Sequence, residues 1–117
     1  MIYRVYGRRN DDFNKLLCET TYDKIDELMP EDSEMELLDM DSSELYNELK
    51  GNLIFYVPTV IVTDNDGCEL GRIENKYFYD IKENHRVNAN GEAVLSPMSN
   101  IWWKSLDRFL LSIREDV

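Results

Sequence analysis

Residues 56–73 of this chain read YVPTVIVTDNDGCELGRI. The β-branched run at residues 59–63 predicts a strand, and its partner strand is expected at residues 68–73. Residues 64–67 between them end in glycine, which is typical of a tight turn between antiparallel strands. Pro58 stands directly before the first of these strands. Because proline has no N–H to donate to a neighbouring strand, this position fits the start of a strand.

The first forty residues predict a strand, a helix and a second strand. Residues 2–6 and 35–40 are rich in β-branched, aromatic and aliphatic side chains and are the predicted strands. The helix between them is expected to begin after Asn10 as its N-cap. It should end near Met29, because Pro30 disfavours a helical residue before it.

Two further helices are expected. Asp41 and Glu44 form a capping-box pattern before a short helix. Residues 100–114 form an amphipathic helix, with one apolar face made of Trp102, Leu106, Phe109 and Ile113. Between them, residues 75–100 hold an insertion whose NANG segment, at residues 88–91, predicts a hairpin turn.

Residues 1–117 are therefore expected to form a single α/β domain. The strand–helix–strand opening implies a parallel pair of strands with a right-handed crossover, and the later hairpin is antiparallel. The predicted architecture is a mixed sheet of about four strands flanked by helices, with an insertion before the C-terminal helix.

This order resembles that of the thioredoxin-like superfamily. The segment DMDSSELYNELKGNLIFYVPTVIVTDNDGCELGRI resembles the second half of thioredoxins, through Val57-Pro58-Thr59 at the start of one strand and Gly71-Arg72 at the end of the next. The opening MIYRVYG resembles the first strand of small phage-type glutaredoxins. The resemblance covers roughly residues 2–74 and the last helix. It implies a thioredoxin-like fold, structural roles for Pro58 and Gly71, and a cis bond at Pro58 that leaves the preceding backbone free to pair with an extended peptide.

The redox motif of that superfamily is missing. Its Cys-x-x-Cys lies between the first strand and the first helix, where residues 7–15 here read GRRNDDFNK. The nearest thiol is Cys18, in a Cys-x-x-Thr that resembles the single-cysteine members. The apolar spacing places Cys18 about two turns into the helix, where a cysteine is expected to pack rather than to react. The alternative is a monothiol thiol–disulfide oxidoreductase that uses Cys18 with Pro58 opposite it.

Negative charge is concentrated in one part of the chain. The net charge is −11, and residues 19–48 hold twelve acidic residues against one basic residue, Lys24. Such a field repels phosphate backbones, so no direct nucleic-acid binding is expected, and the field suits a protein partner with a basic surface. The alternative is that these acids only solvate the surface. Four of them fall on one stripe of the first helix and are candidate binding residues: Glu19, Asp23, Asp26 and Glu27.

The other candidate sites are few. The aromatic triplet Tyr77, Phe78 and Tyr79 in the insertion is a second candidate partner surface. His85, the only histidine, is expected on a surface loop. The spacing of the histidine and the cysteines predicts no metal site, and there is no glycine-rich phosphate loop, so no cofactor is expected.

Localisation follows from what the chain lacks. No apolar run is long enough to span a membrane, and no secretory leader precedes the first charges. Two cysteines are too few for a disulfide framework. The expectation is a cytoplasmic protein, in the host cytoplasm if it is phage-encoded.

The sequence thus favours a non-redox thioredoxin-fold protein that binds or regulates another protein, with no enzyme activity of its own. The phage-like opening favours a small accessory or host-directed protein. Two alternatives stay open. One is the monothiol oxidoreductase, and the other is an acidic decoy for the basic site of a nucleic-acid-binding protein.

Overall fold

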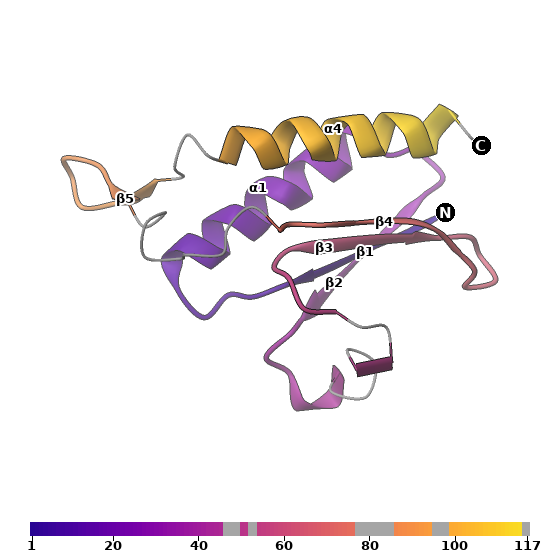
Figure 1. Cartoon of the computed structure of the whole chain (residues 1–117), viewed down its shortest axis with the longest axis horizontal. Helices are drawn as coiled ribbons and strands as arrows, with labels where there is room; N and C mark the ends of the chain where they lie inside the picture. The colour runs from indigo at the N-terminus through magenta and orange to yellow at the C-terminus, as the bar shows by residue number, and fades with distance from the viewer. Residues whose placement is uncertain (46–49, 52–53, 77–85, 95–98, 116–117) are drawn as a thin grey trace.

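The computed structural model describes residues 1–45, 50–51, 54–76, 86–94 and 99–115 (Figure 1). Its elements in chain order are β1 (Ile2–Gly7), α1 (Asp12–Leu28), β2 (Glu34–Asp39), the 3-10 turn η1 (Ser43–Leu45), β3 (Thr59–Thr63), β4 (Glu69–Glu74), β5 (Arg86–Val87), β6 (Ala93–Val94) and α4 (Ser99–Glu115).

The main sheet has four strands in the order β2-β1-β3-β4. β1 runs parallel to β2, while β3 is antiparallel to both β1 and β4. The helices α1 and α4 lie together on one side of this sheet, and η1 lies on the other (Figure 1). The α/β class and the mixed four-stranded sheet are confirmed, and the arrangement is compatible with a thioredoxin-like fold.

The quoted hairpin forms as predicted. β3 covers the predicted residues, and β4 begins one residue later than expected. Gly67 in the turn has φ +88°, a conformation that glycine adopts without steric cost. The second turn signal is also confirmed, because Gly91, with φ +80°, lies in the turn between β5 and β6.

The start of α1 differs from the prediction by one residue. Asp11, not Asn10, is the N-cap: its backbone is extended and its Oδ1 accepts a hydrogen bond from the Asn14 backbone N–H at 2.7 Å. Asn10 Oδ1 instead accepts from the Asn14 side-chain amide at 2.7 Å. Both residue types cap helices well, so spacing alone did not separate them. The helix ends at its C-cap Met29, as predicted.

The short helix expected after Asp41 is described only in part. Residues 43–45 form η1, residues 50–51 are helical, and residues 46–49 lie outside the described part. The Asp41 carboxylate, predicted to belong to the capping box, has its Oδ1 3.2 Å from Arg8 Nε.

The main core lies between the sheet and the two helices. It contains Tyr3 and Val5 from β1, Val60 and Val62 from β3, and the buried faces of α1 and α4. On α4 the predicted face is mostly correct: Trp102, Leu106 and Ile113 are buried, Phe109 is partly buried, and Leu110, which the prediction omitted, is also buried. A smaller cluster of Tyr6, Ile54 and Ile61 lies on the opposite face of the sheet.

Gly71 allows α4 to pack closely on β4. A Cβ at this position would lie 2.9 Å from Ile113 Cδ1 and 3.2 Å from Phe109 Cε2, both closer than ordinary contacts. The absence of a side chain at Gly71 is therefore a packing requirement, which supports its expected structural role.

Candidate functional site

The loop between β1 and α1 carries charge but no thiol. It runs from Arg8 to Asp11, and residues 12–15, the last part of the segment where the redox motif would lie, form the first turn of α1. Arg8 pairs with Asp41, and the Arg9 guanidinium lies 5.8 Å from the centre of the Tyr22 ring. This end of the sheet is therefore suited to electrostatic contacts rather than to thiol chemistry.

Cys18 is fully buried on α1. Its Sγ lies 2.7 Å from the point that a Cβ on Gly7 would occupy, so the thiol packs against the end of β1. Burial raises the pKa of the Cys18 thiol above its ordinary 9.0, against the opposing effects of a backbone hydrogen bond from Arg8 and the charge of Arg9. A nucleophilic cysteine needs the opposite, a lowered pKa and access to solvent.

Cys18 is expected to resist alkylation in the folded protein. With iodoacetamide near neutral pH, intact-protein mass spectrometry should show one adduct, on the exposed Cys68, and a second adduct only in denaturant. Because the folded pKa is raised, the thiol contributes stability below pH 9, and that contribution is lost as pH rises through the folded pKa. Rapid modification of Cys18 in the native protein would revive the monothiol hypothesis.

The Val57–Pro58 bond is cis, as the resemblance implies. Because Tyr6 pairs with Thr59, the register places Pro58 beside Gly7, at the end of the sheet that Cys18 also contacts. The backbone before the proline is not free, however. The Val57 carbonyl accepts a hydrogen bond from Asn75 Nδ2 at 3.0 Å, and the Tyr56 carbonyl accepts one from Thr59 Oγ1 at 2.8 Å. These bonds compete with the peptide pairing that the resemblance implies for this segment.

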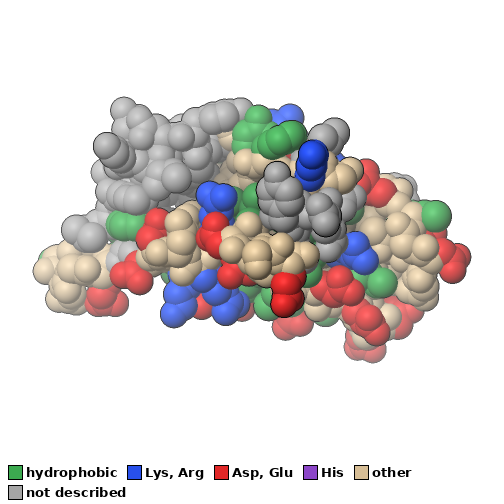
Figure 2. Space-filling model, turned by 90° about the horizontal axis from the view of Figure 1, so that it is seen from below, with side chains coloured by type: hydrophobic (Ala, Val, Ile, Leu, Met, Phe, Trp, Pro, Cys, Tyr) green, Lys and Arg blue, Asp and Glu red, His purple; other side chains and the backbone are tan. Residues whose placement is uncertain are grey.

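The predicted acidic stripe does form on one face of α1. Asp23, Asp26 and Glu27 are exposed and Glu19 is partly buried. Glu19, at the N-terminal end of the stripe, and Asp39, at the end of β2, both raise the pKa of Cys18, so each of these two carboxylates acts on the same buried thiol. On the side of the sheet away from α1 and α4, acidic side chains are spread among Lys and Arg side chains (Figure 2). We call the four α1 residues the acidic stripe.

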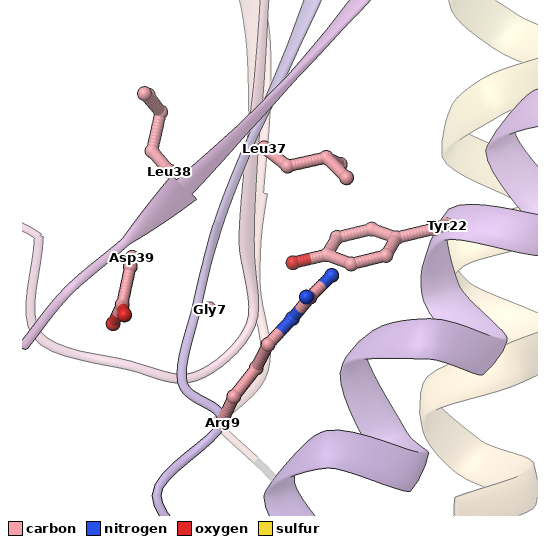
Figure 3. A pocket seen from close by; sticks show the side chains of 6 residues that line it. All are labelled: Gly7, Arg9, Tyr22, Leu37, Leu38 and Asp39. Atoms are coloured by element: carbon pink, nitrogen blue, oxygen red, sulfur yellow. The ribbon is translucent and has the colours of Figure 1, made fainter.

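A cavity of about 260 Å³ opens between α1 and the ends of β1 and β2. It is lined by Gly7, Arg9, Tyr22, Leu37, Leu38 and Asp39. Leu37 and Tyr22 face each other across it, and the Arg9 guanidinium lies beside the Tyr22 ring (Figure 3). Burial raises the pKa of the Tyr22 phenol, while the nearby Arg9 charge opposes that shift, so Tyr22 is neutral at physiological pH. The cavity combines an apolar wall with one cation and one carboxylate.

The sequence prediction did not find this cavity. Asp39 falls within the strand predicted at residues 35–40, but no spacing along the chain connects Arg9 with Tyr22 or either of them with Leu37. The one available signal was the pair of leucines in β2, of which Leu37 is 47% exposed. Together with the cavity beside it, this exposure shows that α1 leaves the sheet partly uncovered at Leu37.

Several expectations are not decided by the structure. Tyr77, Phe78, Tyr79 and His85 lie outside the described residues. Within the described part, no helix is long and apolar enough to cross a membrane, and no group of three or more His, Cys, Asp or Glu side chains is placed to hold a metal ion.

No family model, curated protein or solved structure matches this chain.

Proposed function

We propose that this chain is a thioredoxin-like, non-redox module that binds a protein with a basic surface and so acts by contact rather than by catalysis. The observation that carries the proposal is the position of Cys18. Its sulfur fills the space beside Gly7, and its burial raises the thiol pKa. The thiol nearest to the position of the missing redox motif is thus used for packing.

The charge distribution supports a basic partner. The acidic stripe presents three exposed carboxylates on one face of α1, and Asp39 on the edge strand β2 is also exposed. Exposed charges contribute little to the stability of a fold but strongly affect the rate at which a complementary partner associates.

The two alternatives fare differently. A monothiol mechanism needs an accessible thiolate, and the burial of Cys18 opposes this. A decoy for the basic site of a nucleic-acid-binding protein is a special case of the proposal. It adds the expectation that nucleic acid competes with this chain for the same partner.

The acidic stripe is expected to steer the partner. Replacing Asp23 and Asp26 with lysine should slow association with a captured partner several-fold, and added salt should weaken wild-type binding, because exposed charges are screened beyond about 10 Å at 0.1 M salt. The partner is captured from a native-cell lysate, and its association rate is then measured by surface plasmon resonance.

The matched control for this experiment is Asp66→Lys. Asp66 is an exposed acid in the β3–β4 turn, so the variant makes the same kind of charge reversal away from α1, at one residue instead of two. If neither added salt nor the lysine substitutions at Asp23 and Asp26 change partner binding, the acidic stripe is rejected as the steering surface. The next surface to test would be residues 77–79.

A further inference from the structure

The backbone of β2 offers hydrogen bonds on its outer edge. β2 is an edge strand, paired on one side with β1. Glu34 N donates to Met1 O at 3.0 Å and Met40 N donates to Gly7 O at 2.9 Å. In a parallel ladder, alternate residues direct both their N–H and C=O toward the same neighbour. The even-numbered residues of β2 therefore face β1, and Met35 and Leu37 direct their backbone groups outward.

These outward groups are available for pairing. No described residue hydrogen-bonds the outer backbone groups of Met35 or Leu37, whereas the next odd-numbered carbonyl, that of Asp39, accepts from Ser42 N at 3.1 Å. Such an edge readily pairs with another extended chain. The available stretch is thus limited to the middle of β2, beside the cavity.

Side chains next to this edge favour an apolar contact. Leu37 shares the α1 side of the sheet with its partner Val5, and α1 leaves Leu37 47% exposed. An extended segment added to β2 would direct every second side chain toward Leu37 and the mouth of the cavity. One apolar side chain at that position would cover Leu37 and Tyr22.

The charges beside β2 indicate which kind of segment would bind at this edge. Glu34 and Asp39 form no ion pair within the described residues, whereas Glu36 has its Oε2 3.3 Å from Arg4 Nε. A second copy of this chain would place the acids of one β2 against those of another, which is unfavourable. A segment carrying Lys or Arg would place opposite charges beside Glu34 and Asp39. Charge complementarity therefore favours a basic segment of another protein.

We propose that β2 binds an extended, basic segment of a partner protein as a fifth strand, with one apolar side chain of that segment against Leu37 and Tyr22. This inference rests on the proposed function, since it locates the contact with the basic partner. It moves the main contact from the acidic stripe to the neighbouring sheet edge, and the stripe supplies the attraction at longer range.

The probe is a short synthetic peptide of alternating lysine and valine, with a glutamate–valine peptide as the charge control. Binding is measured by titration, and amide hydrogen exchange is followed residue by residue by NMR. When the lysine peptide is bound, the backbone amides of Met35 and Leu37 are expected to exchange with solvent more slowly. The exchange rates of the amides on the outer edge of β4 should stay unchanged. The glutamate peptide should not bind.

Two matched substitutions test the edge itself. Leu37 on β2 and Leu70 on β4 are 47% and 46% exposed, so each is expected to tolerate lysine. Leu37→Lys removes the apolar contact and adds a like charge, and it should weaken binding of the lysine peptide about tenfold or more. Leu70→Lys should leave binding unchanged. Leu37→Pro should also abolish binding, because it removes the outward N–H without breaking a bond to β1.

The outcomes separate the two proposals. Binding of the lysine peptide without protection of Met35 and Leu37 overturns the edge contact and leaves the basic-partner proposal standing. Absence of binding by this peptide overturns the edge contact too, while the lysate capture tests the basic-partner proposal independently. Protection of the two amides that grows with protein concentration alone would show that a second copy occupies the edge. Equal weakening by Leu37→Lys and Leu70→Lys would likewise reject the edge as the site.

Discussion

Replacing Trp102 with alanine is expected to lower the free energy of unfolding by about 3–5 kcal/mol. Trp102 is fully buried in the main core, and its indole N–H donates to Thr21 Oγ1 on α1 at 3.3 Å. The substitution leaves a large cavity between α4, α1 and the sheet. It also removes a hydrogen bond that joins the two helices. Urea unfolding followed by circular dichroism measures the loss.

Trp103 provides the matched control, because it is the same residue type on the next position of the same helix. It is partly buried, and Lys24 Nζ lies 5.7 Å from its ring centre. Trp103→Ala is expected to cost about 1 kcal/mol, mainly from a partly exposed cation–π contact and some packing. A loss for Trp103 as large as that for Trp102 would contradict the orientation of α4.

The strands were predictable because their signals are local. The β-branched run of β3 and the glycine at position 67 determine a strand and a turn with little help from the rest of the chain. The apolar spacing of α4 likewise revealed its buried face before any partner was known. Residue type did not decide between Asn10 and Asp11 as the cap of α1. The cap is the residue whose side chain reaches the backbone N–H of Asn14, which is Asp11, while Asn10 bonds the side-chain amide of Asn14.

The candidate site was predictable only in its charges. Helical spacing was enough to group the four acids of the acidic stripe on one face of α1. The cavity needs Arg9, Tyr22 and Leu37 to come together from a loop, a helix and an edge strand, and no local rule relates them. The free edge of β2 also depends on strand order, which places β1 between β2 and β3. Tertiary placement, rather than composition, brings these groups together at this end of the molecule.

The same placement makes Gly7 and Cys18 a single packing unit. β1 ends at Gly7 beneath α1, and the missing side chain leaves room for the Cys18 sulfur. The Tyr22 hydroxyl, which belongs to a residue lining the cavity, also lies 3.3 Å from the point that a Gly7 Cβ would occupy. A side chain at position 7 therefore disturbs both the core and the wall of the cavity.

Gly7→Ala is expected to destabilise the fold by about 1–3 kcal/mol, because the new Cβ falls 2.7 Å from Cys18 Sγ. Cys18→Ala alone should cost about 1–2 kcal/mol from lost packing. In the double variant the alanine at position 7 occupies space that the sulfur has left. The double variant should therefore lose less free energy of unfolding than the sum of the two single losses, by about 1 kcal/mol or more. Urea unfolding of the four proteins measures this coupling.

The sign of that coupling distinguishes packing from chemistry at Cys18. If the thiol fills space, removing it relieves the strain of Gly7→Ala, and the two changes compensate. Additive losses would mean that Gly7 and Cys18 are not in contact, and the argument against thiolate chemistry at Cys18 would lose its main support. The coupling is read from stability alone, so it needs no knowledge of the partner and tests the structural premise of the non-redox proposal independently of binding.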